Sequence, residues 1–153
     1  MPCSKQWRTL ASVAVAFAPA EPEMRMSQDS FVHLPDALLR LSTDPATAGD
    51  PIKRMFIFDG EKVSANVSVL TDTGDSIHVQ PDHDELVLIL EGECGFRVGD
   101  SVRRVTVGDL IFIPEGAIHG PIIDNGPVSV LSVFAPFFDR GIKNIKWSHD
   151  NYA

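Results

Sequence analysis

The sequence has few cysteines and few basic residues, and both shortages exclude classes of protein. Its two cysteines, Cys3 and Cys94, lie far apart and neither belongs to a Cys-x-x-Cys pair, so a disulfide framework and a thiolate zinc site are excluded. Lysine and arginine number 13 against 21 aspartate and glutamate residues, which gives a net charge of -8 at pH 7. Such a surface repels phosphate backbones and anionic lipid, so we expect neither a nucleic-acid partner nor a membrane partner.

Long apolar segments are also missing, since no later stretch approaches the ~18 apolar residues of a membrane span. Near the start, the apolar run 10–18 follows two basic residues and precedes Ala18-Pro19-Ala20, the pattern of a short secretory signal. Alternatively, residues 1–25 are an over-extended N-terminus before a start at Met24 or Met26, or an ordered leader. We expect a cytoplasmic protein, or an exported one if residues 1–20 are a genuine signal peptide.

What the chain does contain is a series of short runs rich in valine, isoleucine and phenylalanine. A length of 153 residues predicts one domain, and Gly, Pro, Asn and Asp clusters separate the runs. The only expected helix is short, at 36–41 after Pro35. Strands are expected at 52–58, 62–70, 76–80, 85–91, 93–98, 101–106, 110–113, 120–123 and 128–134. Eight or nine short strands with hardly any helix predict an all-β barrel or double-sheet sandwich.

Some of these strands are apolar on both faces, notably 86–90 and 110–113. A strand with one face in water would alternate apolar and polar residues, so the outer face of this sheet is expected to be covered too. A second copy of the chain is the simplest cover, and we therefore expect a homodimer.

Two groups of residues between positions 78 and 119 have the spacing of a binding site. His78 and Gln80 stand at i and i+2, hence on one face of a strand, and Glu85 and Gly92 follow. Downstream, the stretch from Gly108 reads Gly, five residues, Pro-x-Gly, two residues and then His119. Glu85 lies among Leu, Val and Ile, where an unpaired buried carboxylate is costly, so it favours a nearby cation.

These two motifs resemble those of the cupin superfamily, in particular its small single-domain members that bind a metal. The resemblance implies a double-stranded β-helix, or jelly-roll barrel, over residues 61–140. The segment 26–60 would form an N-terminal extension with a short helix and an edge strand, and 141–153 a C-terminal tail. In the family, two histidines and a glutamate of the first motif and the histidine of the second hold one divalent metal.

Residue by residue, the family's ligand set carries over to His78, Gln80, Glu85 and His119, with Gln80 in place of the second histidine. An amide oxygen is a harder and weaker donor than imidazole, which favours Fe(II) or Mn(II) relative to Zn(II) or Ni(II). Alternatively, Gln80 marks a barrel that binds its ligand without metal. His83, two residues before Glu85, is an alternative third ligand or a solvated turn residue.

The resemblance implies a metal-dependent enzyme, with a dioxygenase as the leading reaction. Glu85 is its candidate catalytic residue, because it neutralises charge at the metal and is placed to shuttle a proton. Inward residues of strands such as 85–90 and 128–134, mainly Val, Leu, Ile and Phe, would line the rest of the pocket. Such a lining beside a metal predicts a small, partly apolar organic substrate that chelates through oxygen, such as an enol, a catechol-like group or a hydroxy acid. The alternatives are a non-catalytic small-molecule-binding module and a non-redox metal-dependent isomerase or lyase.

Overall fold

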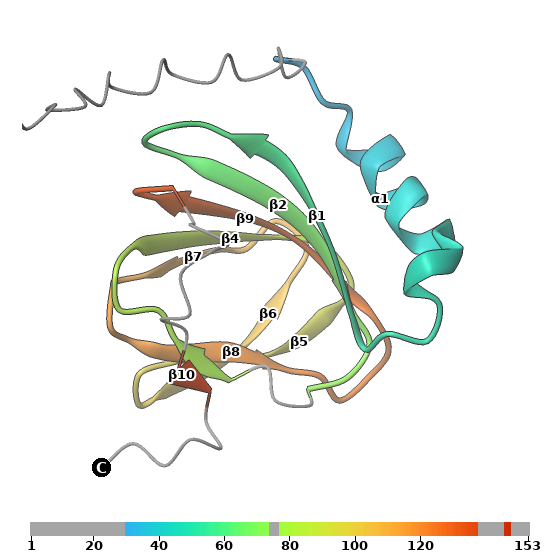
Figure 1. Cartoon of the computed structure of the whole chain (residues 1–153). Coiled ribbons are helices and arrows are strands. Elements are labelled where there is room, and N and C mark those ends of the chain that lie inside the picture. Colours follow the sequence, from blue (N-terminus) through green and yellow to red (C-terminus); the bar gives the residue numbers. More distant parts are fainter. Residues whose placement is uncertain (1–29, 74–76, 138–145, 148–153) are drawn as a thin grey trace, which may run out of the picture.

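The computed structural model describes residues 30–73, 77–137 and 146–147, and these residues form two five-stranded sheets that face each other (Figure 1). The first sheet has the strand order β1-β2-β9-β4-β7 and the second the order β10-β3-β8-β5-β6. The strands of the first sheet are β1 (Ile52–Asp59), β2 (Ser64–Leu70), β4 (Asp84–Glu91), β7 (Leu110–Ile113) and β9 (Val128–Ala135). Those of the second are β3 (His78–Val79), β5 (Glu93–Val98), β6 (Ser101–Thr106), β8 (Ile118–Ile122) and β10 (Lys146–Trp147).

Every pairing between the described strands is antiparallel, and several neighbours in each sheet come from distant parts of the sequence. Strand β9, for example, lies between β2 and β4 in the first sheet. The two sheets enclose a space to which both contribute side chains, as expected for a jelly roll. The all-β prediction is confirmed.

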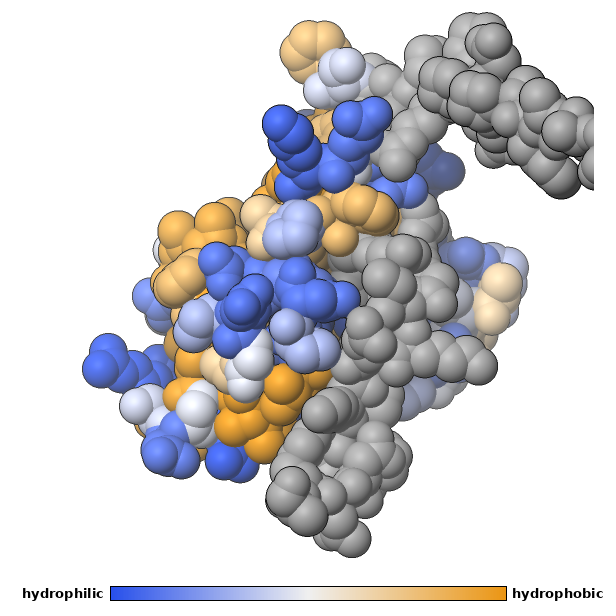
Figure 2. All heavy atoms as spheres, turned by 60° about the vertical axis from the view of Figure 1, so that its left-hand side comes forward, coloured by the Kyte–Doolittle hydropathy of each residue, from blue (hydrophilic) through white to orange (hydrophobic). Residues whose placement is uncertain are grey.

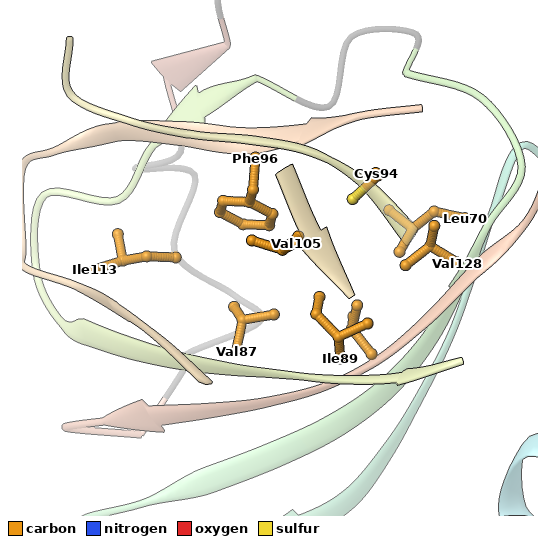
Figure 3. Close-up of a cluster of buried hydrophobic side chains, with 9 residues drawn as sticks. Leu70, Val87, Ile89, Cys94, Phe96, Val105, Ile113 and Val128 are labelled. Atoms are coloured by element: carbon orange, nitrogen blue, oxygen red, sulfur yellow. The ribbon is translucent and has the colours of Figure 1, made fainter. Parts of the chain in front are cut away.

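The main hydrophobic core fills the space between the sheets (Figure 3). Alternate residues of each strand point inward, so the buried positions of β4 are Glu85, Val87 and Ile89. From the opposite sheet, Cys94 and Phe96 of β5 point towards them. Cys94 is fully buried among apolar neighbours, and burial raises the pKa of its thiol, so it acts as a small core residue.

A second apolar cluster lies outside the barrel, where helix α1 (Leu34–Thr43) packs on the first sheet (Figure 1). The buried side chains of α1, Ala37, Leu38 and Leu41, contact Val67 and Val69 on the outer face of β2. A single 3₁₀ turn, Pro45–Thr47, leads from the helix towards β1. None of the helices in the described ranges is both long and apolar enough to cross a membrane.

The element bounds differ from the sequence prediction mainly where the site is built. The helix predicted at 36–41 extends over Leu34–Thr43, and the strand predicted at 62–70 begins at Ser64. The strand predicted at 76–80 is reduced to His78–Val79 within the described residues, since Pro81 follows Gln80 and cannot donate to a ladder.

Strand β8 begins at Ile118 and not at Gly120, as the sequence predicted, because residues 118–119 pair with β3. His119 therefore lies inside a strand rather than in a loop before it. Strand β10 was not predicted and falls in the stretch expected to be a tail. Residues 1–25, the predicted leader or over-extended N-terminus, lie outside the described residues.

Candidate metal centre

Pairing between β3 and β8 places two histidines side by side. His78 and His119 are directly opposite partners in the antiparallel ladder, as are Val79 and Ile118. Side chains of opposite partners project to the same face of a sheet, and the two imidazole rings lie with centroids 4.3 Å apart, tilted by 55°. The second sheet thus presents a pair of ring nitrogens to the interior.

Glu85 reaches the same point from the opposite sheet. It is the first inward residue of β4 and only 6% exposed, and its Oε2 lies 3.2 Å from Nε2 of His119. One potential ligand atom from each of His78, Glu85 and His119 lies within 4.8 Å of the others. The two sheets therefore bring three residues from separate stretches to one spot, as the motifs predicted.

The hydrogen bonding of His119 defines which of its nitrogens faces this spot. Nδ1 lies 2.8 Å from the carbonyl oxygen of Ala117, and because a carbonyl only accepts, Nδ1 carries the proton. In the neutral ring Nε2 then offers a lone pair. This atom is buried and has no hydrogen-bond partner among the described residues.

A carboxylate oxygen and a ring lone pair that face each other at 3.2 Å repel unless a cation lies between them. That cation is either a proton on His119 or a metal ion. A buried nitrogen without a partner among the described residues, a buried carboxylate and a second imidazole form a donor set that fits a divalent metal. The convergence of His119 Nε2, the Glu85 carboxylate and His78 within one small space is the observation that supports this fit.

Opposing effects set the charge state of Glu85. Burial would raise its pKa, but the hydrogen bond and positive charge that a protonated His119 supplies, the hydrogen bond with Ser132 and the positive charge that His78 acquires on protonation act in the other direction. Their sum holds the pKa of Glu85 below its ordinary value. The carboxyl group is therefore ionised at neutral pH and available to a cation.

Gln80 lies beside this cluster and connects it to His83. Its Nε2 is 2.9 Å from Nε2 of His78, and its Oε1 is 2.7 Å from Nε2 of His83. His83 is 4% exposed, contacts the Asp82 carboxylate through Nδ1 at 2.8 Å and meets the ring of Phe134 edge-on. The interpretation of His83 as a solvated turn residue is therefore wrong.

His83 is also not among the residues whose ligand atoms converge, whereas His78, Glu85 and His119 are. Both polar atoms of the Gln80 amide are engaged in hydrogen bonds, so the structure places Gln80 next to the cluster without aiming a free oxygen into it. The roles of Gln80 and His83 as ligands remain predictions.

A small cavity of about 50 Å³ adjoins the cluster, with room for a few water molecules or a small ligand group. Inward residues of β4 and β9 line it, as the sequence predicted, and apolar side chains make up most of the wall. The lining comprises Ile52, Arg54, Ser68, Leu70, His78, Glu85, Val87, Phe96, His119, Gly120, Pro121, Val130 and Ser132.

Sequence reasoning missed three polar residues of this cavity, namely Arg54, Ser68 and Ser132. Arg54 and Ser68 are partners in the β1–β2 ladder, and Nε of Arg54 donates a hydrogen bond of 3.3 Å to Oγ of Ser68. The available signal was a pair of charges, Lys53 and Arg54, just before the apolar run 55–58 of β1. Period-two alternation shows which residues share a face, but not whether that face is the interior.

Comparison with known proteins supports the jelly-roll fold described above. Residues 66–134 match the family model of the cupin domain. Among curated proteins none matches the sequence. The chain is similar to the crystal structure of TT1209 from Thermus thermophilus, with 28% identity, a TM-score of 0.56, and coverage of 66% of this chain and 95% of that one.

Two other solved structures share the fold at lower identity. A double-stranded β-helix protein from Klebsiella pneumoniae has a TM-score of 0.61 at 17% identity, covering 78% of this chain and 96% of that one. The DMSP lyase DddQ from Ruegeria pomeroyi DSS-3 has a TM-score of 0.57 at 20% identity, covering 72% and 58%. The fold is thus the cupin double-stranded β-helix, and these matches support the cupin superfamily, with a His/Glu/His cluster that could hold a metal.

Proposed function

We propose that this chain is a metal-dependent cupin enzyme that acts on a small organic substrate with oxygen groups able to chelate the ion. The observation that carries the proposal is the buried Nε2 of His119, unpartnered among the described residues, facing the carboxylate of Glu85. Packing alone does not require such a pair, whereas a shared cation satisfies both atoms.

His78, Glu85 and His119 would hold the ion, with Gln80 as a fourth ligand once its amide leaves His78. A lone pair on His78 Nε2 serves either the Gln80 amide or an ion, so binding through this nitrogen would release Gln80. Four protein ligands of which only Glu85 is anionic suit Fe(II) or Mn(II), with Zn(II) or Ni(II) as weaker fits. When bound, such a metal supplies Lewis acidity and, if it is iron, redox chemistry.

The chain's own residues then position and protect the substrate. The bond from His119 Nδ1 to Ala117 fixes the ring so that Nε2 faces the interior, and Ser132 restrains the carboxylate of Glu85. Apolar neighbours such as Val87 and Val130 exclude bulk water from this end of the cavity. With its low pKa, Glu85 holds a negative charge near the reacting atoms and is placed to accept a proton at Oε2.

A dioxygenase is the reaction we favour, and two other functions compete with it. One is a non-catalytic module that binds a small molecule without metal. The other is a non-redox isomerase or lyase, a class suggested by the fold shared with a DMSP lyase.

Metal analysis and oxygen uptake separate the three. Protein purified without chelator is assayed for metal and then for oxygen consumption with a catechol, an enolisable diketone and a 2-hydroxy acid. We expect bound iron and substrate-dependent oxygen uptake. A bound metal without oxygen uptake would favour the isomerase or lyase. Metal-free protein whose melting temperature does not change when chelator is added would favour the binding module.

A further inference from the structure

A charged side chain on the wall of the cavity has no role in the function proposed so far. Arg54 is the third residue of β1, an edge strand of the first sheet, and lines the same cavity as His78, Glu85 and His119. It also lines a groove on the outside of the molecule, beside the end of α1. Arg54 therefore stands where the cavity and the outer surface meet. Its strand, β1, forms one edge of the first sheet (Figure 1).

The orientation of Arg54 is held by a chain of hydrogen bonds across two strands. Its Nε donates to Oγ of Ser68 at 3.3 Å, and that hydroxyl donates to Oδ1 of Asn66 at 3.1 Å. Among the described residues, Arg54 forms no ion pair and its two terminal nitrogens have no hydrogen-bond partner. The bond through Nε thus fixes the orientation of the guanidinium group, and its two terminal nitrogens are available to bind a carboxylate with two parallel hydrogen bonds.

Asn66 provides a second unsatisfied donor on the same inner face. The residue is 1% exposed, and its Nδ2 has no hydrogen-bond partner within the described part of the chain. Asn66, Ser68 and Leu70 alternate along β2, and Ser68 and Leu70 line the cavity, so Asn66 continues the same inward face. Buried donors without partners are uncommon in folded proteins and are often completed by water or a ligand.

Charge at this end of the barrel also favours an anion. Glu85 contributes one negative charge and Arg54 one positive charge, so a divalent ion at the candidate centre would leave the cavity clearly positive. Partial desolvation of the guanidinium lowers the pKa of Arg54, and the negative charge of Glu85 opposes that effect. Because the residue as a whole is exposed and an arginine is protonated far above neutral pH, Arg54 keeps its positive charge. Strands β2 and β9 separate β1 from β4, which puts the backbones of these two strands about 14 Å apart. The side chains of Arg54 and Glu85 both reach into the cavity between them and shorten this gap, so a molecule of a few carbon atoms could contact Arg54 and the ligand cluster together.

We infer that Arg54, held by Ser68, binds a carboxylate of the substrate and restricts the site to small organic acids whose other end meets the His/Glu/His cluster. This inference rests on the proposed function for the position of the reacting end. The carboxylate accepts two hydrogen bonds from the terminal nitrogens of the Arg54 guanidinium. Arg54 takes no part in the covalent bonds that the reaction makes or breaks. It is a specificity-determining residue.

Binding of matched acids and amides tests the inference. Glycolate and lactate, beside the neutral glycolamide and lactamide, are titrated by calorimetry into the full chain loaded with Mn(II). We expect the wild-type protein to bind each acid at least tenfold more tightly than its amide. Arg54→Gln should abolish that preference without changing the bound Mn(II), and Arg54→Lys should retain part of it, because the charge remains while the fork is lost.

The matched control is Arg40→Gln, which removes the same charge from the outer groove but not from the cavity. It should leave the preference intact. Failure of the wild-type protein to prefer acids, an unchanged preference in Arg54→Gln, or an equal loss in Arg40→Gln would overturn the inference. If the protein binds no Mn(II) but still shows a preference that depends on Arg54, the metal-dependent function fails and the inference stands.

Discussion

At the scale of single residues, the chemistry depends on how His78, Gln80, Glu85 and His119 share protons and lone pairs. His119 is fixed by Ala117, Glu85 is ionised beside it, and His78 is occupied by the amide of Gln80. The motif positions of His78, Glu85 and His119 were enough to predict that they converge. The hydrogen bond between Gln80 and His83 was not predictable, because nothing in the local sequence shows that His83 points inward.

Gln80→His tests whether position 80 reaches the ion. Imidazole is a stronger donor than an amide oxygen for late transition metals, so we expect Zn(II) and Ni(II) to bind about tenfold or more tightly to the variant. Competition with a chromophoric chelator measures the change. Unchanged affinity would show that Gln80 supports His78 and does not ligate the metal.

The lowered pKa of Glu85 predicts a pH dependence of stability in the metal-free protein. A carboxyl whose pKa is lower in the folded state than its ordinary value of 4.5 stabilises the fold above that value. This contribution is lost as the pH falls through the lowered folded pKa. Thermal melts from pH 7 downwards should therefore show that wild type loses stability relative to Glu85→Gln below about pH 4.5. Parallel curves for the two proteins would contradict the assignment.

At the scale of elements, the site depends on the short strand β3 and on the turns that end the longer strands. Valine-rich runs and turn residues predicted most of the long strands to within a residue or two. They did not predict that β3 has only two residues or that β8 begins at Ile118, since both bounds are set by pairing between distant segments. The mutual positions of His78 and His119 follow from that pairing.

Gly92, in the turn between β4 and β5, is the position where backbone geometry is most demanding. Its φ is +78°, and an added Cβ would collide with the carbonyl oxygen of Pro127. Gly99 has a φ of +59° but open space around it. We expect Gly92→Ala to lower the free energy of unfolding by about 3 kcal/mol, from strain and steric overlap together.

Gly99→Ala, the control, should cost only about 1 kcal/mol, because it incurs the conformational strain without the collision. Urea denaturation of both variants beside wild type measures the difference. Equal losses in the two variants would show that contact with Pro127 does not constrain the turn.

At the scale of the whole molecule, part of the outer face of the first sheet is bare. Helix α1 covers Leu90 and Leu131, but Leu86, Leu110 and Phe112 are 39%, 66% and 58% exposed. Leu86 and Phe112 are ladder partners, so they form a continuous apolar area. The face in Figure 2 likewise shows apolar groups gathered in patches between hydrophilic ones. This agrees with the two-sided apolar pattern from which a covering subunit was predicted.

We propose that this area is the interface of a homodimer. Sedimentation velocity should then give about twice the chain mass of 16.7 kDa. Phe112→Glu should dissociate the dimer, whereas Val102→Glu, at a site 56% exposed on the other sheet, should not. A wild-type protein that sediments as a monomer at micromolar concentration would contradict the proposal.

Metal binding by the whole barrel depends on whether the two sheets bring His78, Glu85 and His119 together around one divalent ion. Equilibrium dialysis against Mn(II) with electron paramagnetic resonance detection tests this most directly, using wild type, Glu85→Gln and the control Glu91→Gln at the exposed end of the same strand. We expect about one ion per chain in wild type and control, and at least a tenfold loss of affinity in Glu85→Gln. Absence of binding in wild type, or equal binding in Glu85→Gln, would contradict this central claim.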